Sequence, residues 1–372
     1  MIYKDYFLKK AHFKPNMLTK QQIQELEKQQ YRMVGNHSAV KVCGWTKKML
    51  RSEGACYKFK FYGIRSHQCM QMTSSMFCAN RCTFCWRGEK APVAKVWKGE
   101  VDDPDTIIEL SQKRHMSLLQ GFGGNDKTKD FLFQEAKQVR HVALSLTGEP
   151  IAYPKINELL EKFHKAKIST FLVTNAQYPE QIAKIKNVTQ FYISVDAPNK
   201  IKLKEIDRPL FPDFYERLLK SLDIMKEATY RTCIRLTIIK DQNDLDLQGY
   251  KTLIMRGSPD FIEVKGYMHV GASRKFLERE NMPMHEEIDT FTQSLIETLG
   301  DEYTVTSEHK PSRVLCLMHK RMQGKQYIDF PKFFEIVNKE NDNKKDEKSN
   351  ENNETPIANS LDYSNEKMTP NC

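Results

Sequence analysis

Short apolar runs alternate with amphipathic stretches between about Thr73 and Cys316, and this alternation limits the possible folds more than any other feature of the chain. A strand-like run followed by a segment of helical periodicity is the pattern of βαβ units around a parallel sheet. Right-handed crossovers then allow either a doubly wound layer or a barrel. Because six such units follow one another and no GxGxxG fingerprint is present, we predict an α/β fold, an incomplete (βα)6 TIM-like barrel.

The boundaries of the predicted strands follow from runs of β-branched and aromatic residues, and those of the predicted helices follow from the periodicity of apolar residues. The predicted strands are the run entering Thr73–Met76, then His141–Leu146, Ser169–Thr174, Gln190–Val195, Thr232–Ile239 and Phe261–Lys265. The predicted helices are Asp105–Leu119, Lys155–Lys165, Tyr178–Ile185, Pro212–Glu227, Asp246–Met255 and His285–Leu299.

Three regions are expected along the chain. Residues 1–70 form an N-terminal extension with one plausible helix (Thr19–Met33), residues 71–337 form the barrel, and residues 338–372 form a tail. The tail is dominated by Asn, Lys, Asp, Glu and Ser, so it has too little apolar surface to offset the entropy lost on ordering. We therefore predict that it is disordered.

The positive charge of the chain is concentrated in its first quarter. The 58 Lys and Arg residues against 48 Asp and Glu give a net charge of +10. Residues 1–98 hold 19 basic and 5 acidic residues, residues 99–337 hold 34 and 35, and residues 338–372 hold 5 and 8. A basic region of this kind favours a polyanionic partner such as nucleic acid. Since neither a membrane span nor a signal peptide is recognisable, we expect a cytoplasmic protein without a membrane partner.

Six of the nine cysteines lie between positions 43 and 85. An odd number of cysteines outside a secretory context favours metal or redox chemistry over disulfides. Cys78, Cys82 and Cys85 form a CxxxCxxC motif directly after the first predicted strand. Three thiolates on one loop can hold three irons of a [4Fe-4S] cluster and leave the fourth open, whereas structural zinc takes four ligands. A zinc site completed by a distant His is the alternative. The isolated cysteines are Cys233, Cys316 and Cys372.

Cys43, Cys56 and Cys69 are spaced Cx12Cx12C, which fits neither zinc fingers nor ferredoxins. Three further thiolates suggest a second cluster with an open iron, able to act as a Lewis acid towards a small oxo acid. Lys58 lies two positions after Cys56, between two aromatic residues. A lysine in such a setting can act as a neutral amine that condenses with a carbonyl. Contact with an RNA phosphate is the alternative for Lys58.

The CxxxCxxC motif resembles that of the radical S-adenosylmethionine (SAM) enzymes. The Cx12Cx12C motif with CYKxxFYGIxSHxC inside it resembles the tRNA 4-demethylwyosine synthases, over roughly residues 35–320. This resemblance implies a radical SAM barrel with a cluster-bearing N-terminal extension. It implies that Lys58 forms a Schiff base with pyruvate. It also implies two [4Fe-4S] clusters, one on Cys78, Cys82 and Cys85 that binds SAM, and an auxiliary one on Cys43, Cys56 and Cys69.

The resemblance also assigns residues to the SAM pocket. Phe84 precedes the third cysteine of the motif, where the family packs an aromatic ring near adenine. The segment Thr147, Gly148, Glu149 resembles the family's GGEP segment, which receives the methionine amino group. Further candidates end the third and fourth predicted strands, where barrel active sites are built, although they could equally cap the following helices. They are Thr174, Asn175, Ser194 and Asp196.

The implied activity is that of a carbon-carbon lyase type radical SAM enzyme that uses pyruvate to convert N1-methylguanosine-37 of tRNA-Phe to 4-demethylwyosine in wyosine biosynthesis. A 5′-deoxyadenosyl radical abstracts hydrogen from the N1-methyl group, and two carbons of pyruvate enter the new ring. Eukaryotic members carry a flavodoxin-like domain, for which this chain has no room, so it resembles the stand-alone archaeal type. We therefore expect an external one-electron reductant of flavodoxin or ferredoxin type, and a monomer.

RNA contact is predicted from cations and aromatic residues within the cysteine-bearing segment, because no named RNA-binding module is present. The candidates are Arg65, His67, Arg81, Trp86 and Arg87. Two other functions compete with the main interpretation. One is a different radical SAM reaction on RNA, and the other is a zinc-stabilised RNA-binding module without catalysis.

Overall fold

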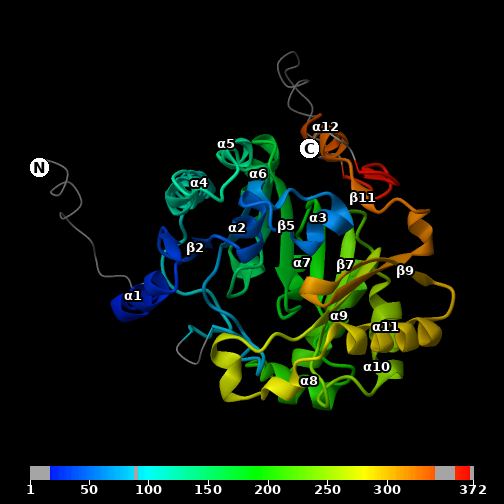
Figure 1. Ribbon diagram of the computed structural model, residues 1–372. Coiled ribbons are helices and arrows are strands. Elements are labelled where there is room, and N and C mark those ends of the chain that lie inside the picture. The colour runs from blue at the N-terminus through cyan, green and yellow to red at the C-terminus, as the bar shows by residue number, and fades with distance from the viewer. Residues whose placement is uncertain (1–16, 88–90, 340–356, 369–372) are drawn as a thin grey trace, which may run out of the picture.

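The computed structural model describes residues 17–87, 91–339 and 357–368, and its centre is a sheet of ten strands (Figure 1). The strand order is β1-β2-β3-β4-β5-β6-β7-β8-β10-β9, and the six strands from β3 to β8 run parallel to one another. These six are β3 (Cys69–Thr73), β4 (His141–Leu144), β5 (Ser169–Thr174), β6 (Gln190–Ser194), β7 (Thr232–Ile238) and β8 (Phe261–Gly266). The predicted (βα)6 arrangement of parallel strands is confirmed.

Helices follow the parallel strands as the periodicity predicts. They are α4 (Pro104–Leu119), α5 (Asp130–Ala136), α6 (Ile156–Lys165), α7 (Pro179–Ile182), α8 (Lys200–Asp207), α9 (Phe214–Lys226), α10 (Leu247–Gly257) and α11 (His285–Leu299). The apolar stripes of all but α5 pack on the outer face of the sheet, whereas α5 packs beside α2 (Gly44–Leu50). Helices α5 and α8 are additions to the prediction. The first predicted strand was placed too far along the chain, by about one strand length. Strand β3 ends at Thr73, and the chain then turns, with Met76 N–H donating to His37 O.

Antiparallel strands extend the parallel sheet at both edges, and the sequence pattern did not reveal them. On one side β1 (Arg32–Val34) and β2 (Ser38–Lys41) form a hairpin that pairs with β3. On the other side β10 (Val314–His319) pairs with β8 and with β9 (Tyr303–His309). The predicted boundary at residues 70 and 71 therefore falls inside β3, and the N-terminal extension contributes strands to the same sheet.

Among the described residues, three short α-helices precede β3. The first, α1 (Lys20–Lys28), begins at a capping box of Thr19 and Gln22 and is shorter than the predicted Thr19–Met33, because Gln30 takes a left-handed conformation before β1. Helices α2 (Gly44–Leu50) and α3 (Tyr57–Tyr62) follow directly after Cys43 and Cys56. Within the described residues no helix is long and apolar enough to cross a membrane.

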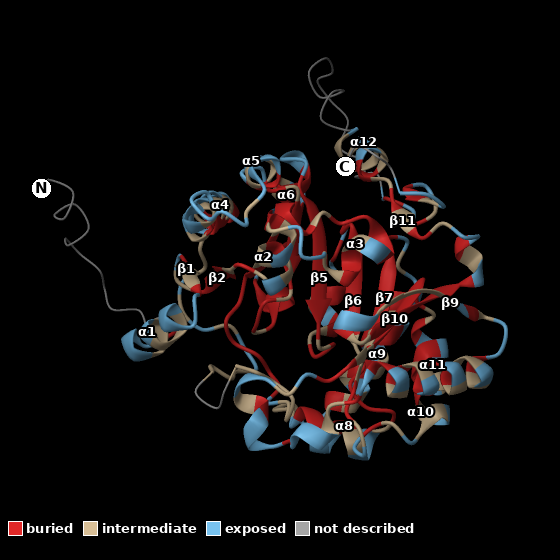
Figure 2. Ribbon diagram, viewed as in Figure 1, coloured by how far each residue is buried: buried red, intermediate tan, exposed pale blue. Residues whose placement is uncertain are grey.

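The parallel strands are largely buried (Figure 2), and the alternation of side chains along each strand separates two cores. Leu172, Ile193 and Ile234 belong to the core between the sheet and the outer helices. Their strand neighbours Phe171, Tyr192 and Cys233 belong to a second core inside the open barrel. Helix α3 supplies Tyr57, Phe61 and Tyr62 to this inner core, so the cysteine-bearing extension fills the barrel interior.

The C-terminal region corrects one prediction. Helix α12 (Phe330–Asn338) packs near α6, and residues 357–368 form an ordered segment in which β12 (Ser364–Asn365) pairs with β11 (Tyr327–Ile328). Tyr363 is completely buried, and its hydroxyl accepts from Arg231 N–H and donates to Thr189 O. The tail prediction was wrong for 357–368 because Ala358 and Tyr363, few as they are, both reach the inner core. Residues 340–356 and Cys372 lie outside the described residues.

Candidate functional site

An open cavity with about 740 Å³ of empty space lies at the carboxyl ends of the parallel strands. It is lined from five consecutive strand ends, which is where side chains from distant segments of a barrel meet. The loop after β3 gives the first cysteine motif, and the loop after β4 gives the TGEP segment. The predicted residues that line it are Cys78, Cys82, Phe84, Cys85, Trp86, Arg87, Thr147, Gly148, Glu149, Thr174, Asn175, Ser194 and Asp196.

Glu149 lines this cavity and is buried, and only one of its two carboxylate oxygens has a hydrogen-bond partner among the described residues. Its Oε2 accepts from the backbone N–H of Asn175 at 3.1 Å, whereas its Oε1 has no hydrogen-bond partner among the described residues. Burial raises the pKa of Glu149 to about 7. A buried carboxylate oxygen left without a partner is costly, so it fits a ligand that brings a cation or a donor.

The turn that carries Glu149 depends on Gly148. This residue has φ of 67°, which disfavours residues with a Cβ. A Cβ there would overlap Ser75 O and would lie 2.8 Å from the carbonyl carbon of Met76. Glycine therefore lets the loop after β4 approach the loop after β3, which leads into the cysteine motif.

Asp196 follows β6 and is a second buried carboxyl group that faces the cavity. Its Oδ1 has no hydrogen-bond partner among the described residues, and burial raises its pKa to about 6. Arg235 on β7 lines the same cavity and donates from Nη2 to Ser194 Oγ at 3.4 Å. The sequence reasoning missed Arg235, although a single cation inside the apolar run TCIRLTII was a usable signal.

The thiols of Cys78, Cys82 and Cys85 lie close enough to perturb one another's ionisation. Cys78 Sγ accepts from Asn175 Nδ2 at 3.2 Å and from Asn80 N–H at 3.4 Å, and Arg87 Nε donates to Cys85 Sγ at 3.4 Å. Burial raises the pKa of Cys78 to about 12. Donors aimed at sulfur stabilise thiolate and tune iron-sulfur clusters, so this donor set fits a cluster held at the cavity.

The second triplet is brought together from three elements. Cys43 precedes α2, Cys56 precedes α3 and Cys69 begins β3. Burial is the largest cause that raises the pKa of Cys56 and of Cys69 to about 12 each, while the thiols of Cys43 and Cys56 both add to the rise at Cys69, and the thiol of Cys43 adds to that at Cys56. In the described part of the chain, no group of three or more His, Cys, Asp or Glu side chains is spaced to hold a single metal ion.

Lys58 lies in the first turn of α3, beside the second triplet, and its side chain is almost fully buried. Its Nζ is 4.4 Å from the ring centroid of Tyr192 and 5.5 Å from that of Phe171. No carboxylate among the described residues lies within ion-pair distance of this amine. The positive charge of Lys58 opposes the rise in the pKa of both Cys56 and Cys69. The lysine is thus held in an aromatic pocket at the thiols.

Glu263 on β8 organises the helix that carries Lys58, and the sequence reasoning missed it. Its two carboxylate oxygens accept from the hydroxyls of Tyr57 and Tyr62, both at 3.0 Å. Glu263 is completely buried. These two hydrogen bonds fix the face of α3 that points into the barrel, and they set the direction in which Lys58 projects.

The residues predicted to contact RNA fall into three groups. His67 is 1% exposed and shares a 2.7 Å hydrogen bond with Glu135, so the prediction for His67 was wrong because the ring is packed inside the fold. Arg65 lies 3.5 Å from the same carboxylate. Arg87 and Trp86 are half-buried, Arg87 against Cys85 and Trp86 stacked on Tyr31 at 5.9 Å. Arg81 is exposed.

Two family models match consecutive parts of the chain. Residues 72–254 match the "Radical SAM superfamily" family model, and residues 256–319 match the model for "Wyosine base formation". The S-adenosyl-L-methionine-dependent tRNA 4-demethylwyosine synthase TYW1 of Xenopus laevis is 45% identical over 86% of this chain and 44% of its own length. The Oryza sativa protein of the same description is 45% identical over 84% of this chain and 49% of its own length. The chain thus spans about half the length of these relatives.

Two solved structures are similar along nearly their whole length. One, described as "Structure of TYW1 with a lysine-pyruvate adduct bound", has a TM-score of 0.75 and 35% identity over 84% of this chain and 99% of its own. The other, "Crystal structure of archaeal TYW1", has a TM-score of 0.67 and 33% identity over 82% of this chain and 97% of its own. The stand-alone archaeal type stays a prediction.

Proposed function

The chain belongs to the tRNA 4-demethylwyosine synthase family of radical SAM proteins, and we propose that it catalyses the family's reaction. In this reaction N1-methylguanosine-37 of tRNA-Phe and pyruvate give 4-demethylwyosine. The observation that carries the proposal is the position of Lys58, a buried amine beside a second cysteine triplet in a fold similar to a structure with a lysine-pyruvate adduct.

Lys58 would bind pyruvate covalently. Its amine attacks the keto carbon, water leaves, and a C=N bond joins Nζ to pyruvate. The rings of Tyr192 and Phe171 exclude water from this linkage, and the hydrogen bonds of Glu263 hold α3 in place. In our proposal Cys43, Cys56 and Cys69 hold an auxiliary [4Fe-4S] cluster next to the adduct.

Cys78, Cys82 and Cys85 would hold the cluster that binds SAM, whose reductive cleavage supplies the radical chemistry. Glu149 would accept a hydrogen bond from the methionine amino group on its unpartnered Oε1, and Asp196 would accept from a ribose hydroxyl. Arg235, which donates to Ser194 across the cavity, is placed to bind a carboxylate. These groups orient SAM, and the chain's own residues perform no redox step.

Isotope-labelled pyruvate tests the proposal. Anaerobic protein with about eight iron and eight sulfide per chain is incubated with tRNA containing m1G37, SAM, a one-electron reductant and pyruvate. The product nucleoside should retain label from carbons 2 and 3 of pyruvate and none from carbon 1, because the carboxyl carbon is lost. Absence of the tricyclic base, with both clusters intact, would contradict the proposal.

The same preparation separates the competing functions. A zinc-stabilised RNA-binding module would be colourless and would cleave no SAM. A different radical SAM reaction on RNA would give 5′-deoxyadenosine and a modified nucleoside without pyruvate label. Neither alternative gives a reason for a buried lysine beside the second triplet.

A further inference from the structure

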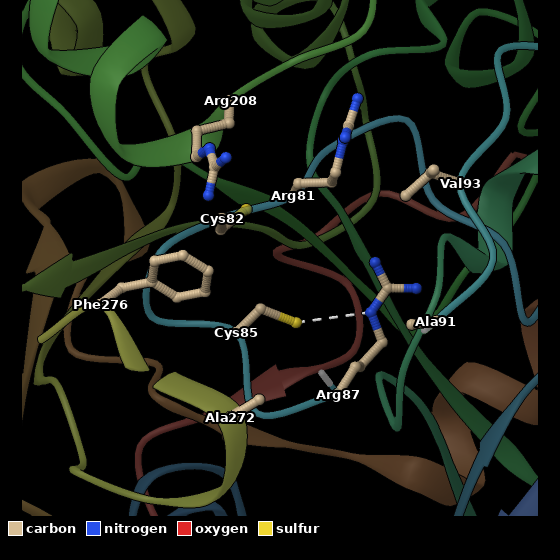
Figure 3. A pocket seen from close by; sticks show the side chains of 9 residues that line it. All are labelled: Arg81, Cys82, Cys85, Arg87, Ala91, Val93, Arg208, Ala272 and Phe276. Carbon is tan, nitrogen blue, oxygen red and sulfur yellow. Dashed lines mark hydrogen bonds between the residues drawn. The ribbon is translucent and has the colours of Figure 1, made fainter. Parts of the chain in front are cut away.

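A second cavity, with about 790 Å³ of empty space, lies next to the first cysteine motif. Cys82 and Cys85 line both this cavity and the one that would hold SAM, so an occupant of the second would lie beside the reacting groups. Figure 3 shows side chains from several distant segments around this space. The lining residues are Arg81, Cys82, Cys85, Arg87, Ala91, Val93, Arg208, Ala272 and Phe276.

The cavity combines exposed cations with an exposed aromatic ring. Arg81 and Arg208 are both exposed, and neither guanidinium has a carboxylate of the described residues within ion-pair distance. The Arg208 guanidinium lies 5.1 Å from the ring centroid of Phe276. Phe276 is 41% exposed. Unpaired arginines bind phosphate oxygens, and an exposed ring offers a surface on which a base can stack.

Two parts of the chain form this cavity. Arg81 and Arg208 come from the portion that matches the radical SAM superfamily, whereas Phe276 comes from the portion that matches wyosine base formation. The two portions are in direct contact, since Ala272 N–H donates to Trp86 O at 3.3 Å. Gly271 makes this approach possible, because it has φ of 62° and a Cβ there would lie 2.6 Å from Trp86 O. The wyosine-specific portion therefore supplies the aromatic wall beside the cysteine loop.

We propose that Arg81, Arg208 and Phe276 bind a nucleotide of the single-stranded anticodon loop next to the base that reacts. The two guanidinium groups hold backbone phosphates, and the Phe276 ring stacks on one base. This inference rests on the proposed function in that the RNA is the substrate. Unpaired bases of a tRNA loop can be splayed out and stacked on an aromatic side chain, whereas paired bases cannot. The site would therefore hold the neighbour of the target nucleotide while the target enters the reaction cavity.

Binding of a fluorescent anticodon stem-loop by the cluster-loaded full chain tests the site. Phe276→Leu removes the aromatic face and should weaken binding about fivefold or more, whereas Phe276→Tyr should retain it. Arg208→Gln and Arg81→Gln should each lower the slope of log affinity against log salt by about 0.7. Arg114→Gln is the matched control, because Arg114 is an exposed arginine on α4 and should leave affinity and slope unchanged.

The iron content and visible absorption of each variant show whether it has folded and holds its clusters. If Phe276→Leu does not fold, Arg208→Gln still tests the site, because Arg208 is exposed and its substitution should not disturb the fold. The site is wrong if Arg208→Gln and Phe276→Leu bind the stem-loop as tightly as the parent, with the same salt slope. The proposed function fails separately. A parent that binds the stem-loop through these residues yet makes no 4-demethylwyosine would retain the RNA site and refute the reaction.

Discussion

Substitution of Gly148 by Ala should destabilise the protein and remove SAM binding together. The left-handed backbone at Gly148 costs a residue with a Cβ about 1–2 kcal/mol. In addition, the three atoms nearest to that Cβ are all backbone, namely Ser75 O and the carbonyl carbons of Ser75 and Met76, so rotation of a side chain cannot relieve the overlap. Overpacking of this kind costs about 1–3 kcal/mol. We therefore expect the free energy of unfolding to fall by about 2–5 kcal/mol.

The functional part of this prediction follows from the neighbours of Gly148. Relief of the overlap must separate the loop after β3, which leads into Cys78, from the turn that carries Glu149. Both line the cavity in which we place SAM, so SAM affinity should fall in parallel with stability. Urea unfolding of the cluster-loaded protein, followed by tryptophan fluorescence, measures the first effect, and calorimetric titration with SAM measures the second.

Gly121→Ala is the matched control. No atom lies within 4 Å of a Cβ at this position, so the methyl group should be neutral or stabilise by about 0.4–1 kcal/mol through the unfolded state. The reasoning is refuted if Gly148→Ala unfolds at the same urea midpoint as Gly121→Ala. A Gly148→Ala protein with lowered stability but unchanged SAM affinity would refute the placement of SAM instead.

Three further substitutions test other parts of the structure. Burial raises the pKa of Glu149 to about 7, so the ionised fraction of its carboxyl group rises from about 0.1 at pH 6 to about 0.75 at pH 7.5. SAM should therefore bind about eightfold more tightly at pH 7.5 than at pH 6. Calorimetry should not find this increase in Glu149→Gln. Lys58→Arg keeps the charge but cannot condense with a keto acid, so borohydride trapping with labelled pyruvate should label the parent and not the variant. The iron content and SAM affinity of the variant should stay unchanged. Labelling of the variant would contradict the Schiff base. Tyr363→Phe leaves the buried N–H of Arg231 without its partner and should lower the free energy of unfolding by about 1–3 kcal/mol. An unchanged urea midpoint would show that this hydrogen bond does not stabilise the fold.

The elements that the sequence determined are those encoded within one segment. The ranges Ser169–Thr174 for β5 and His285–Leu299 for α11 were predicted to the residue, because short β-branched runs and a 3.6-residue period are local properties. The CxxxCxxC motif is equally local, since one loop carries all three thiols. Its spacing and that of Cx12Cx12C were sufficient to indicate the family before any contact was known.

Only the tertiary structure decided which distant segments meet. Arg235 reaches the cavity because β7 lies beside β6, and Glu263 fixes α3 from a strand about two hundred residues away in the sequence. The same long-range packing buries His67 against Glu135 and draws Tyr363 into the inner core, against the expectation from local composition.

The sequence therefore did not determine which charged side chains are exposed or which groups they contact. Whether an arginine is a solvated charge, a partner of a thiolate or part of a binding cavity depends on what faces it, and those neighbours come from other strands and loops. Arg87 and Arg81 lie six residues apart and line the same cavity, yet Arg87 is half-buried and donates to Cys85 Sγ, whereas Arg81 is exposed. The local sequence fixed the chemistry that this chain can perform, and the packing of the barrel determined which side chains are positioned for it.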